Sequence, residues 1–255
     1  MRAPLVLPSL METSVSLNGL FIPSRNLEKH LTTFCKSLNV WTRDPIHKIQ
    51  LLGSGTPVKF RDRYLVVCSA QQLDDIDPKD VCLLYSDGGL AITSSGVRYF
   101  KAPVRRETDE FDIAVFDFTE ALEEHTSFRS HFWNFDYVPP TVSSDHVLAI
   151  LACGFPFDDQ VYELWEKNHL RTRIRAAVAL LENQPTDHAL LKARYQSPLD
   201  IDPNGMSGGP VYVVQLVGEV PTVYLGGMML RSGREYLYFL KSGFIMDFLN
   251  QATMK

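Results

Sequence analysis

The stretch NGMSGGPV, residues Asn204–Val211, is the most informative part of this chain. A serine lies among glycines, and a proline ends the run before the apolar segment Val211–Val214. Glycines adopt backbone conformations that other residues avoid, so this composition favours a tight turn that projects the Ser207 hydroxyl. In such a turn the N–H groups of Gly205 and Ser207 can face one developing negative charge. The stretch therefore predicts a nucleophile loop or, more simply, a glycine-rich hairpin.

The stretch resembles the nucleophile loop of chymotrypsin-like serine proteases, Gly-x-Ser-Gly-Gly-Pro. Two further segments resemble that family in the order that the family uses. Phe111–Val115, FDIAV, is similar to the segment that carries its aspartate, here Asp112. Val67–Leu73, VCSAQQL, resembles the segment of its general-base histidine, but Gln71 stands at the histidine position. The resemblance implies Ser207 as nucleophile, Asp112 as orienting acid and Gln71 in place of the base.

The resemblance extends over roughly residues 46–250, since three more segments are similar to the family. These are a Gly-x-Gly hairpin, a strand with a Gly-Phe-Pro turn, and a strand after the nucleophile: Gly53–Gly55, Val147–Pro156 and Tyr224–Met229. It implies an all-β fold of two six-stranded antiparallel β-barrels, over residues 46–118 and 147–255, joined by residues 119–146. The many short apolar runs between turn residues favour the same fold, because closed barrels have no free sheet edges.

Helices are expected at both ends of the chain. Residues 24–38 carry apolar side chains at helical spacing, so residues 1–45 would form an extension with an amphipathic helix. This helix would pack on the barrel or bind a protein partner. A short helix over 244–251 would close the second barrel, and residues 119–133 predict a further short helix between the barrels.

The activity that we expect of this chain depends mainly on the absence of the general-base histidine. A neutral imidazole accepts the serine proton because its pKa lies near neutral pH, whereas a glutamine amide has no useful basicity. Loss of the triad base lowers kcat by about 10^6 in one well-studied serine protease. None of the seven histidines stands at the position of Gln71. The chain is therefore expected to be a nearly inactive trypsin-like serine endopeptidase whose base was replaced. The alternative is a natural pseudoprotease that serves as a peptide-binding or adaptor module.

The resemblance also indicates a substrate pocket. Ile201 and Asp202 lie where the family has the floor of its primary specificity pocket, and Gly226 and Gly227 lie on the strand after the nucleophile. Asp202 in that pocket would favour Lys or Arg side chains, whereas Ile201 would favour apolar ones. Met206 stands where zymogen-activated members have an aspartate, which implies an oxyanion hole that forms without proteolytic activation.

Composition narrows the class of protein further. The 255 residues carry a net charge of −5 without a basic stripe, which argues against nucleic-acid binding. No apolar run approaches the length of a membrane span, and no His or Cys pair has metal-site spacing. The cysteines miss the bridge positions of secreted family members, which favours free thiols and a cytoplasmic location: Cys35, Cys68, Cys82 and Cys153. We expect a peptide or protein substrate, and neither metal nor cofactor.

Overall fold

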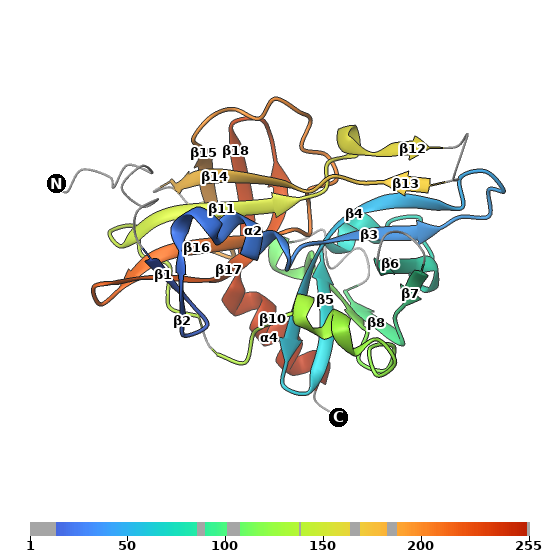
Figure 1. Cartoon of the computed structure of the whole chain (residues 1–255), viewed down its shortest axis with the longest axis horizontal. Coiled ribbons are helices and arrows are strands. Elements are labelled where there is room, and N and C mark those ends of the chain that lie inside the picture. Colours follow the sequence, from blue (N-terminus) through green and yellow to red (C-terminus); the bar gives the residue numbers. More distant parts are fainter. Residues whose placement is uncertain are drawn as a thin grey trace.

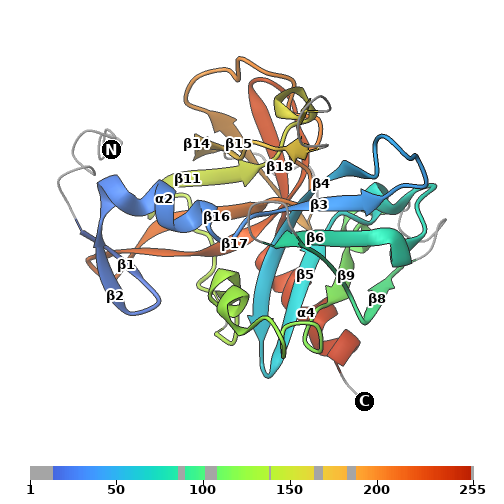
Figure 2. The same ribbon diagram turned by 45° about the vertical axis from the view of Figure 1, so that its right-hand side comes forward.

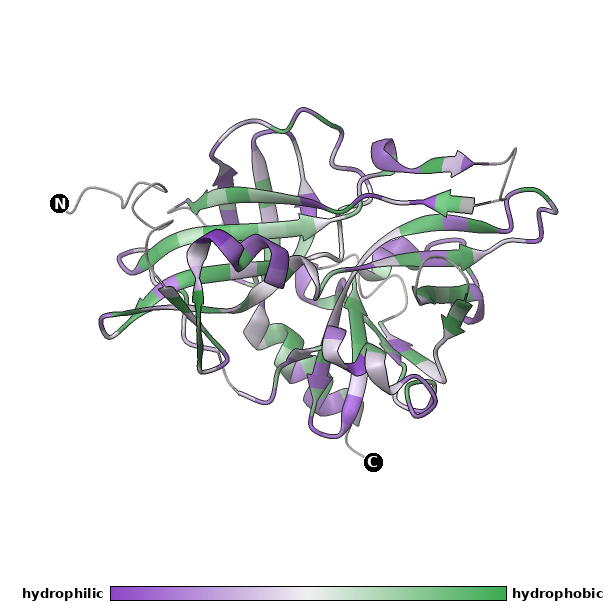
Figure 3. Cartoon of the chain, viewed as in Figure 1, coloured by the Kyte–Doolittle hydropathy of each residue, from purple (hydrophilic) through white to green (hydrophobic). Residues whose placement is uncertain are grey.

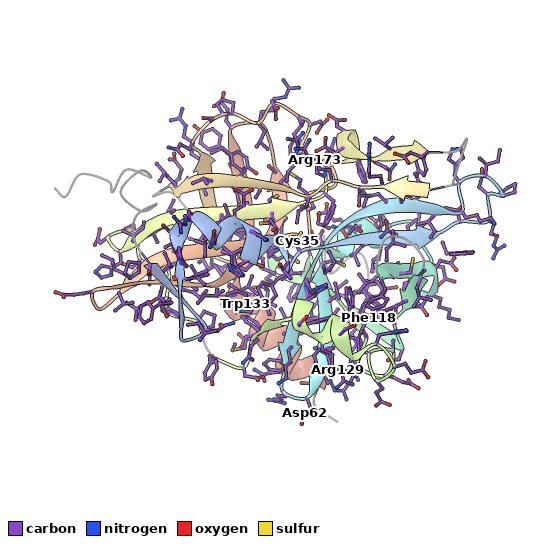
Figure 4. All side chains as sticks on the ribbon, in the orientation of Figure 1. Cys35, Asp62, Phe118, Arg129, Trp133 and Arg173 are labelled. Atoms are coloured by element: carbon purple, nitrogen blue, oxygen red, sulfur yellow. The ribbon has the colours of Figure 1, made fainter. Side chains whose placement is uncertain are left out.

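Strands from the two halves of the chain form two β-structures, with a helix near each end of the chain (Figure 1). This computed structural model describes residues 14–85, 90–100, 108–137, 139–163, 169–182 and 188–253. The expected all-β, two-barrel fold is confirmed. Buried side chains of both halves join in one core, in which the Trp133 and Tyr212 rings lie 5.2 Å apart. Cys35 belongs to the same core, and Figure 4 places it near the junction of the halves.

The second half of the chain forms a closed antiparallel barrel. Its strands pair in the order β16-β11-β14-β15-β18-β17, and β16 pairs with β17 to complete the circle. They are β11 (Val147–Gly154), β14 (Arg175–Leu181), β15 (Leu190–Tyr195), β16 (Pro210–Val217), β17 (Val220–Ser232) and β18 (Tyr236–Lys241). Alternate residues point inward and are buried, so the barrel is filled by apolar side chains such as Ile150, Val213 and Phe239. A small hairpin, β12 (Val161–Glu163) and β13 (His169–Arg171), follows β11.

The first half forms a curled half-barrel. Its strands pair in the order β7-β6-β3-β4-β5-β9-β8, and the described residues include no pairing between β7 and β8. They are β3 (Lys36–Trp41), β4 (Ile49–Phe60), β5 (Arg63–Cys68), β6 (Val81–Tyr85), β7 (Leu90–Thr93), β8 (Gly96–Tyr99) and β9 (Ala114–Asp117). The concave side holds a second apolar cluster that includes Leu38 and Phe116. In its first half the expected ring of strands is therefore open.

The N-terminal segment covers the closed barrel. A hairpin of β1 (Ser14–Leu17) and β2 (Leu20–Pro23) extends the barrel sheet, because β1 pairs in parallel with β17. The turn η1 (Ser24–Asn26) and helix α2 (Leu27–Thr32) follow, and Figure 2 shows α2 beside β11 and β16. The helix is shorter than the expected 24–38, since Lys36 already begins β3. Leu31 is fully buried, and its carbonyl accepts a hydrogen bond from the Tyr212 hydroxyl.

Helix α4 (Ser242–Thr253) confirms the expected closing helix with a few more residues at each end. It starts directly after β18 and buries Ile245 and Leu249. The helix expected over 119–133 does not form as one element. Turns lead instead to a 3-10 helix, η5 (Thr126–His131), and to the short strand β10 (Trp133–Asn134), which pairs with β4. Phe128 and Phe132 anchor this segment in the core of the first half, so packing overrides the local helical pattern.

All four cysteines are buried and none forms a disulfide, as expected. Burial raises the pKa of the Cys35, Cys68 and Cys153 thiols and raises that of Cys82 to about 11. In Figure 3 strand β11, which carries Cys153, is largely hydrophobic, whereas α2 in front of it shows hydrophilic residues. Among the described residues, no helix combines the length and the apolar character needed to cross a bilayer.

Candidate active site

The serine predicted as nucleophile lies in a tight loop directly before β16. We call residues 203–209 the Ser207 loop. Two backbone hydrogen bonds fold it: the Met206 N–H donates to the Pro203 carbonyl at 2.9 Å, and the Gly209 N–H donates to Met206 at 3.1 Å. Gly205 and Gly208 have φ values of +95° and +82°, which L-residues rarely adopt. The glycines of the motif are thus required by the backbone itself.

Close contacts with other strands also require glycines in this loop. A Cβ atom at Gly208 would lie 2.1 Å from the Ser54 carbonyl oxygen, and one at Gly209 would lie 2.0 Å from that of Cys153. Ser54 belongs to β4 and Cys153 to β11, so the loop is held between strands of both halves. Met206, at the position of the zymogen aspartate, is fully buried in the barrel core.

Ser54 attaches the Ser207 loop to the first half of the chain. Its side chain is fully buried, and its hydroxyl donates to the Gly205 carbonyl at 2.7 Å and accepts from the Phe155 N–H at 2.8 Å. Its own N–H donates to the Ser207 carbonyl at 3.2 Å. Thr56, two residues along β4, adds a 2.8 Å bond from its hydroxyl to the Gly208 carbonyl. These bonds fix the position of the Ser207 loop against strand β4.

The Ser207 hydroxyl is half-buried and donates to the Leu230 carbonyl of β17 at 2.9 Å. Within the part of the chain that the structure describes, the N–H groups of Gly205 and Ser207 donate to no acceptor. Two unused N–H donors beside a serine hydroxyl are what an oxyanion site requires. The loop thus brings together the predicted nucleophile and the predicted oxyanion donors.

Asp112 lies directly under the segment that was expected to carry the base. We call residues 69–73 the Gln71 segment; it contains the 3-10 helix η2 (Ala70–Leu73). Asp112 is only 1% exposed, and its two carboxylate oxygens accept from the Ser69 hydroxyl at 2.7 Å and from the Gln71 backbone N–H at 2.8 Å. Burial, and secondarily this carboxylate, raises the pKa of the nearby Cys68 thiol. The side chain of Gln71 itself is exposed.

Gln72, which the sequence analysis did not single out, is the glutamine that reaches the Ser207 loop. Its amide nitrogen donates to the Ser54 carbonyl at 3.2 Å and to the Ser207 carbonyl. The glycines make room for it, because a Cβ at Gly53 or Gly208 would lie 3.0 or 2.6 Å from this amide. Its amide oxygen is buried, and no hydrogen-bond partner is found for it among the described residues. Gln72 thus links the Gln71 segment to the Ser207 loop.

The expected pocket residues lie in different surroundings. Asp202 is exposed, and its carboxylate accepts from the backbone and side-chain N–H groups of Asn204 in its own loop. Ile201 is half-buried. Gly226 and Gly227 lie within β17, where an added Cβ would meet neighbouring strands. A groove of about 570 Å³ beside Gly226 is lined mainly by residues 139–142 and the start of α4, and its described lining includes neither Asp202 nor Ser207.

An ion pair and a hydrogen bond join the halves beside the site. Asp109 pairs with Arg231, the residue after Leu230, and the Glu110 carboxylate lies 2.8 Å from the His188 ring nitrogen. Both acids belong to the 3-10 helix η4 (Asp109–Phe111), which leads into Asp112. His188 is therefore engaged with Glu110. No group of three or more His, Cys, Asp or Glu residues suited to a metal occurs among the described residues.

No protein-family model matches this chain, and no curated protein matches it significantly. The closed six-stranded barrel with its half-barrel is chymotrypsin-like in general shape. Shape alone assigns no activity, since one fold hosts many functions. The groups whose chemistry can indicate a function are the Ser207 loop, Asp112 and the Gln71 segment.

Proposed function

We propose that this chain is a serine-peptidase-type protein that binds peptides at the Ser207 loop and hydrolyses them far more slowly than an intact triad does. The observation that carries the proposal is the bond from the Gln71 N–H to the buried Asp112 carboxylate. It supports Gln71 as the occupant of the position that a general-base histidine would take. The bonds from Ser54 and Gln72 to the Ser207 loop support a common site.

The chemistry of the site favours binding over turnover. The Ser207 hydroxyl donates to the Leu230 carbonyl, which is a hydrogen-bond acceptor but not a base. A glutamine amide at position 71 is not a base either, so the Ser207 hydroxyl keeps its proton. The N–H groups of Gly205 and Ser207 can still bind a peptide carbonyl oxygen. Such a site retains about 10^3–10^4-fold acceleration over water in serine proteases that lack triad members.

A second candidate function is that of a serine endopeptidase that is nearly inactive in this form, because glutamine has replaced its base. The buried, doubly hydrogen-bonded Asp112 favours it, because this carboxylate is placed to orient a ring at position 71. For both candidates we propose a cytoplasmic location, which is supported by four buried thiols that form no disulfide bridges.

The substitution Gln71→His tests both candidates. We expect fluorogenic-peptide hydrolysis and fluorophosphonate labelling to rise by at least about 10^3-fold, because the imidazole supplies the missing base. Gln71→Ala is the matched control and should stay inactive. Labelling of Gln71→His should vanish in the Gln71→His/Ser207→Ala protein. A folded Gln71→His protein that remains inert would exclude the recently disabled enzyme, and failure to bind any peptide as well would exclude the peptide-binding function.

A further inference from the structure

One outward face of the closed barrel carries cations over tyrosine rings. The Lys192 amine lies 4.1 Å from the ring centre of Tyr236 and 5.9 Å from that of Tyr238. The guanidinium of Arg194 lies 5.6 Å from the Tyr236 ring, and that of Arg231 lies 5.8 Å from the Tyr238 ring. These distances fall within the range of cation–π attraction. We call these five residues the cation–tyrosine face.

The strand register places these side chains on one surface. Lys192 of β15 and Arg231 of β17 are both paired with Tyr238 of the intervening strand β18. The alternate residues Ala193 and Leu237 are fully buried inside the barrel. Because side chains alternate across a strand, the paired cations and rings point outward together.

Within the described part of the chain, two of the three cations have no acidic partner. Arg231 is paired with Asp109, whereas no ion pair among the described residues engages Lys192 or Arg194. Glu182 flanks Lys192 on the neighbouring chain segment, where its N–H donates to the Lys192 carbonyl. The chain as a whole is acidic, with 30 Asp and Glu against 25 Lys and Arg. Unpaired cations among tyrosines therefore form a local site of complementary charge for an anionic ligand.

The face is continuous with the candidate active site. Arg231 directly follows Leu230, whose carbonyl accepts the Ser207 hydroxyl at 2.9 Å. Across the sheet from Arg231 lie Tyr238 of β18 and then Lys192 of β15, so a peptide bound at Ser207 meets the face where it turns across these strands.

We propose that the cation–tyrosine face binds Asp or Glu side chains of a peptide that is held at the Ser207 loop. The ligand class is thus an acidic polypeptide segment, in contrast to the Lys or Arg preference that Asp202 suggested. This inference rests on the proposed peptide-binding function. A nucleic acid is also anionic, but peptide is favoured because the face adjoins Ser207 and its cations are too few to follow a phosphate backbone.

Binding of three labelled probes tests the proposal: a decaglutamate peptide, a decalysine peptide and a ten-residue oligothymidylate. The variant Lys192→Glu/Arg194→Glu removes the unpaired cations. Lys29→Glu/Lys79→Glu is the matched control, because both lysines are exposed, lie outside the face and give the same change in net charge. We expect decaglutamate binding to weaken at least about tenfold in the first variant and less than about twofold in the control. Decalysine should not bind more tightly than decaglutamate.

Equal decaglutamate binding by the two variants overturns the proposal, as does tighter binding of oligothymidylate that is lost with the same substitutions. The conservative pair Lys192→Arg/Arg194→Lys keeps the charges and should keep the binding. The assay needs no turnover, so it separates the two proposals. If Gln71→His stays inert while decaglutamate binding depends on Lys192 and Arg194, the peptidase function fails and the acidic-peptide site remains.

Discussion

The Ser207 loop and the Gln71 segment are held in different ways. In the loop, glycines at positive φ approach backbone atoms of both halves so closely that a methyl group would collide with them. In the segment, Ala70 and Leu73 are buried, but the Gln71 side chain faces solvent. Packing therefore constrains the nucleophile motif whether or not catalysis occurs, whereas only chemistry constrains residue 71. A complete Gly-x-Ser-Gly-Gly-Pro motif is thus weaker evidence for activity than the identity of one exposed residue.

We expect the largest loss of stability from a substitution that disrupts the Ser207 loop. Gly208→Ala forces a Cβ to within 2.1 Å of the Ser54 carbonyl at φ +82°. We expect a loss of about 3 kcal/mol or more of unfolding free energy. Gly218→Ala is the control, since its φ is +65° but no atom lies within 4 Å of the added Cβ, and it should cost about 1 kcal/mol. Urea denaturation compares them, and equal losses would show that close contact does not constrain the loop.

Replacing one serine in each region, Ser69 or Ser207, compares how much each hydroxyl contributes to stability. Ser69→Ala removes a buried donor from the Asp112 carboxylate and should lower the unfolding free energy by about 2 kcal/mol. Ser207→Ala removes a half-buried bond to a neutral carbonyl and should cost about 1 kcal/mol or less. Thermal and urea unfolding measure both changes. A more harmful Ser207→Ala would contradict the view that this hydroxyl serves chemistry and not stability.

The smallest expected effect concerns the two adjacent glutamines. Gln71→Ala should change the unfolding free energy by less than about 0.5 kcal/mol, because the side chain is exposed and its N–H bond to Asp112 belongs to the backbone. Gln72→Ala removes two bonds to carbonyls of β4 and the Ser207 loop, and should cost about 1–2 kcal/mol. If urea unfolding shows a larger loss of unfolding free energy for Gln71→Ala than for Gln72→Ala, the structural role belongs to Gln71.

Much of the fold could be predicted from the sequence. Turn residues delimit the barrel strands, and the apolar runs fall where the strands lie. The predicted helix over 24–38 is too long, because its apolar spacing continues into Lys36–Trp41, a segment that pairs with β4. Hairpin β1–β2 was missed, because β1 is stabilised by pairing with Thr222 and Val223, far along the chain. Long-range pairing is not visible in local patterns.

At the candidate site, the sequence predicted which segments come together better than it predicted which side chains contact one another. It predicted Gln71 between Asp112 and Ser207. The Gln71 backbone N–H does donate to Asp112, since both lie at the ends of adjacent strands β9 and β5, but the Gln71 side chain is exposed. It did not predict Gln72, because only the space beside Gly53 and Gly208 makes that side chain a link. The role suggested for Asp202 depended on a side-chain direction that its bonds to Asn204 do not support.

The parallel pairing of β1 with β17 has a consequence for synthesis on the ribosome. Ser16 pairs with Thr222, so β1 leaves the ribosome about 200 residues before its partner, or about 10–40 s at typical elongation rates. During that interval the hairpin, with Leu20 and Phe21 exposed even in the finished protein, has no neighbouring strand. The hairpin is therefore made long before the strand on which it docks, and nascent chains that end before β17 would be most prone to aggregate through it.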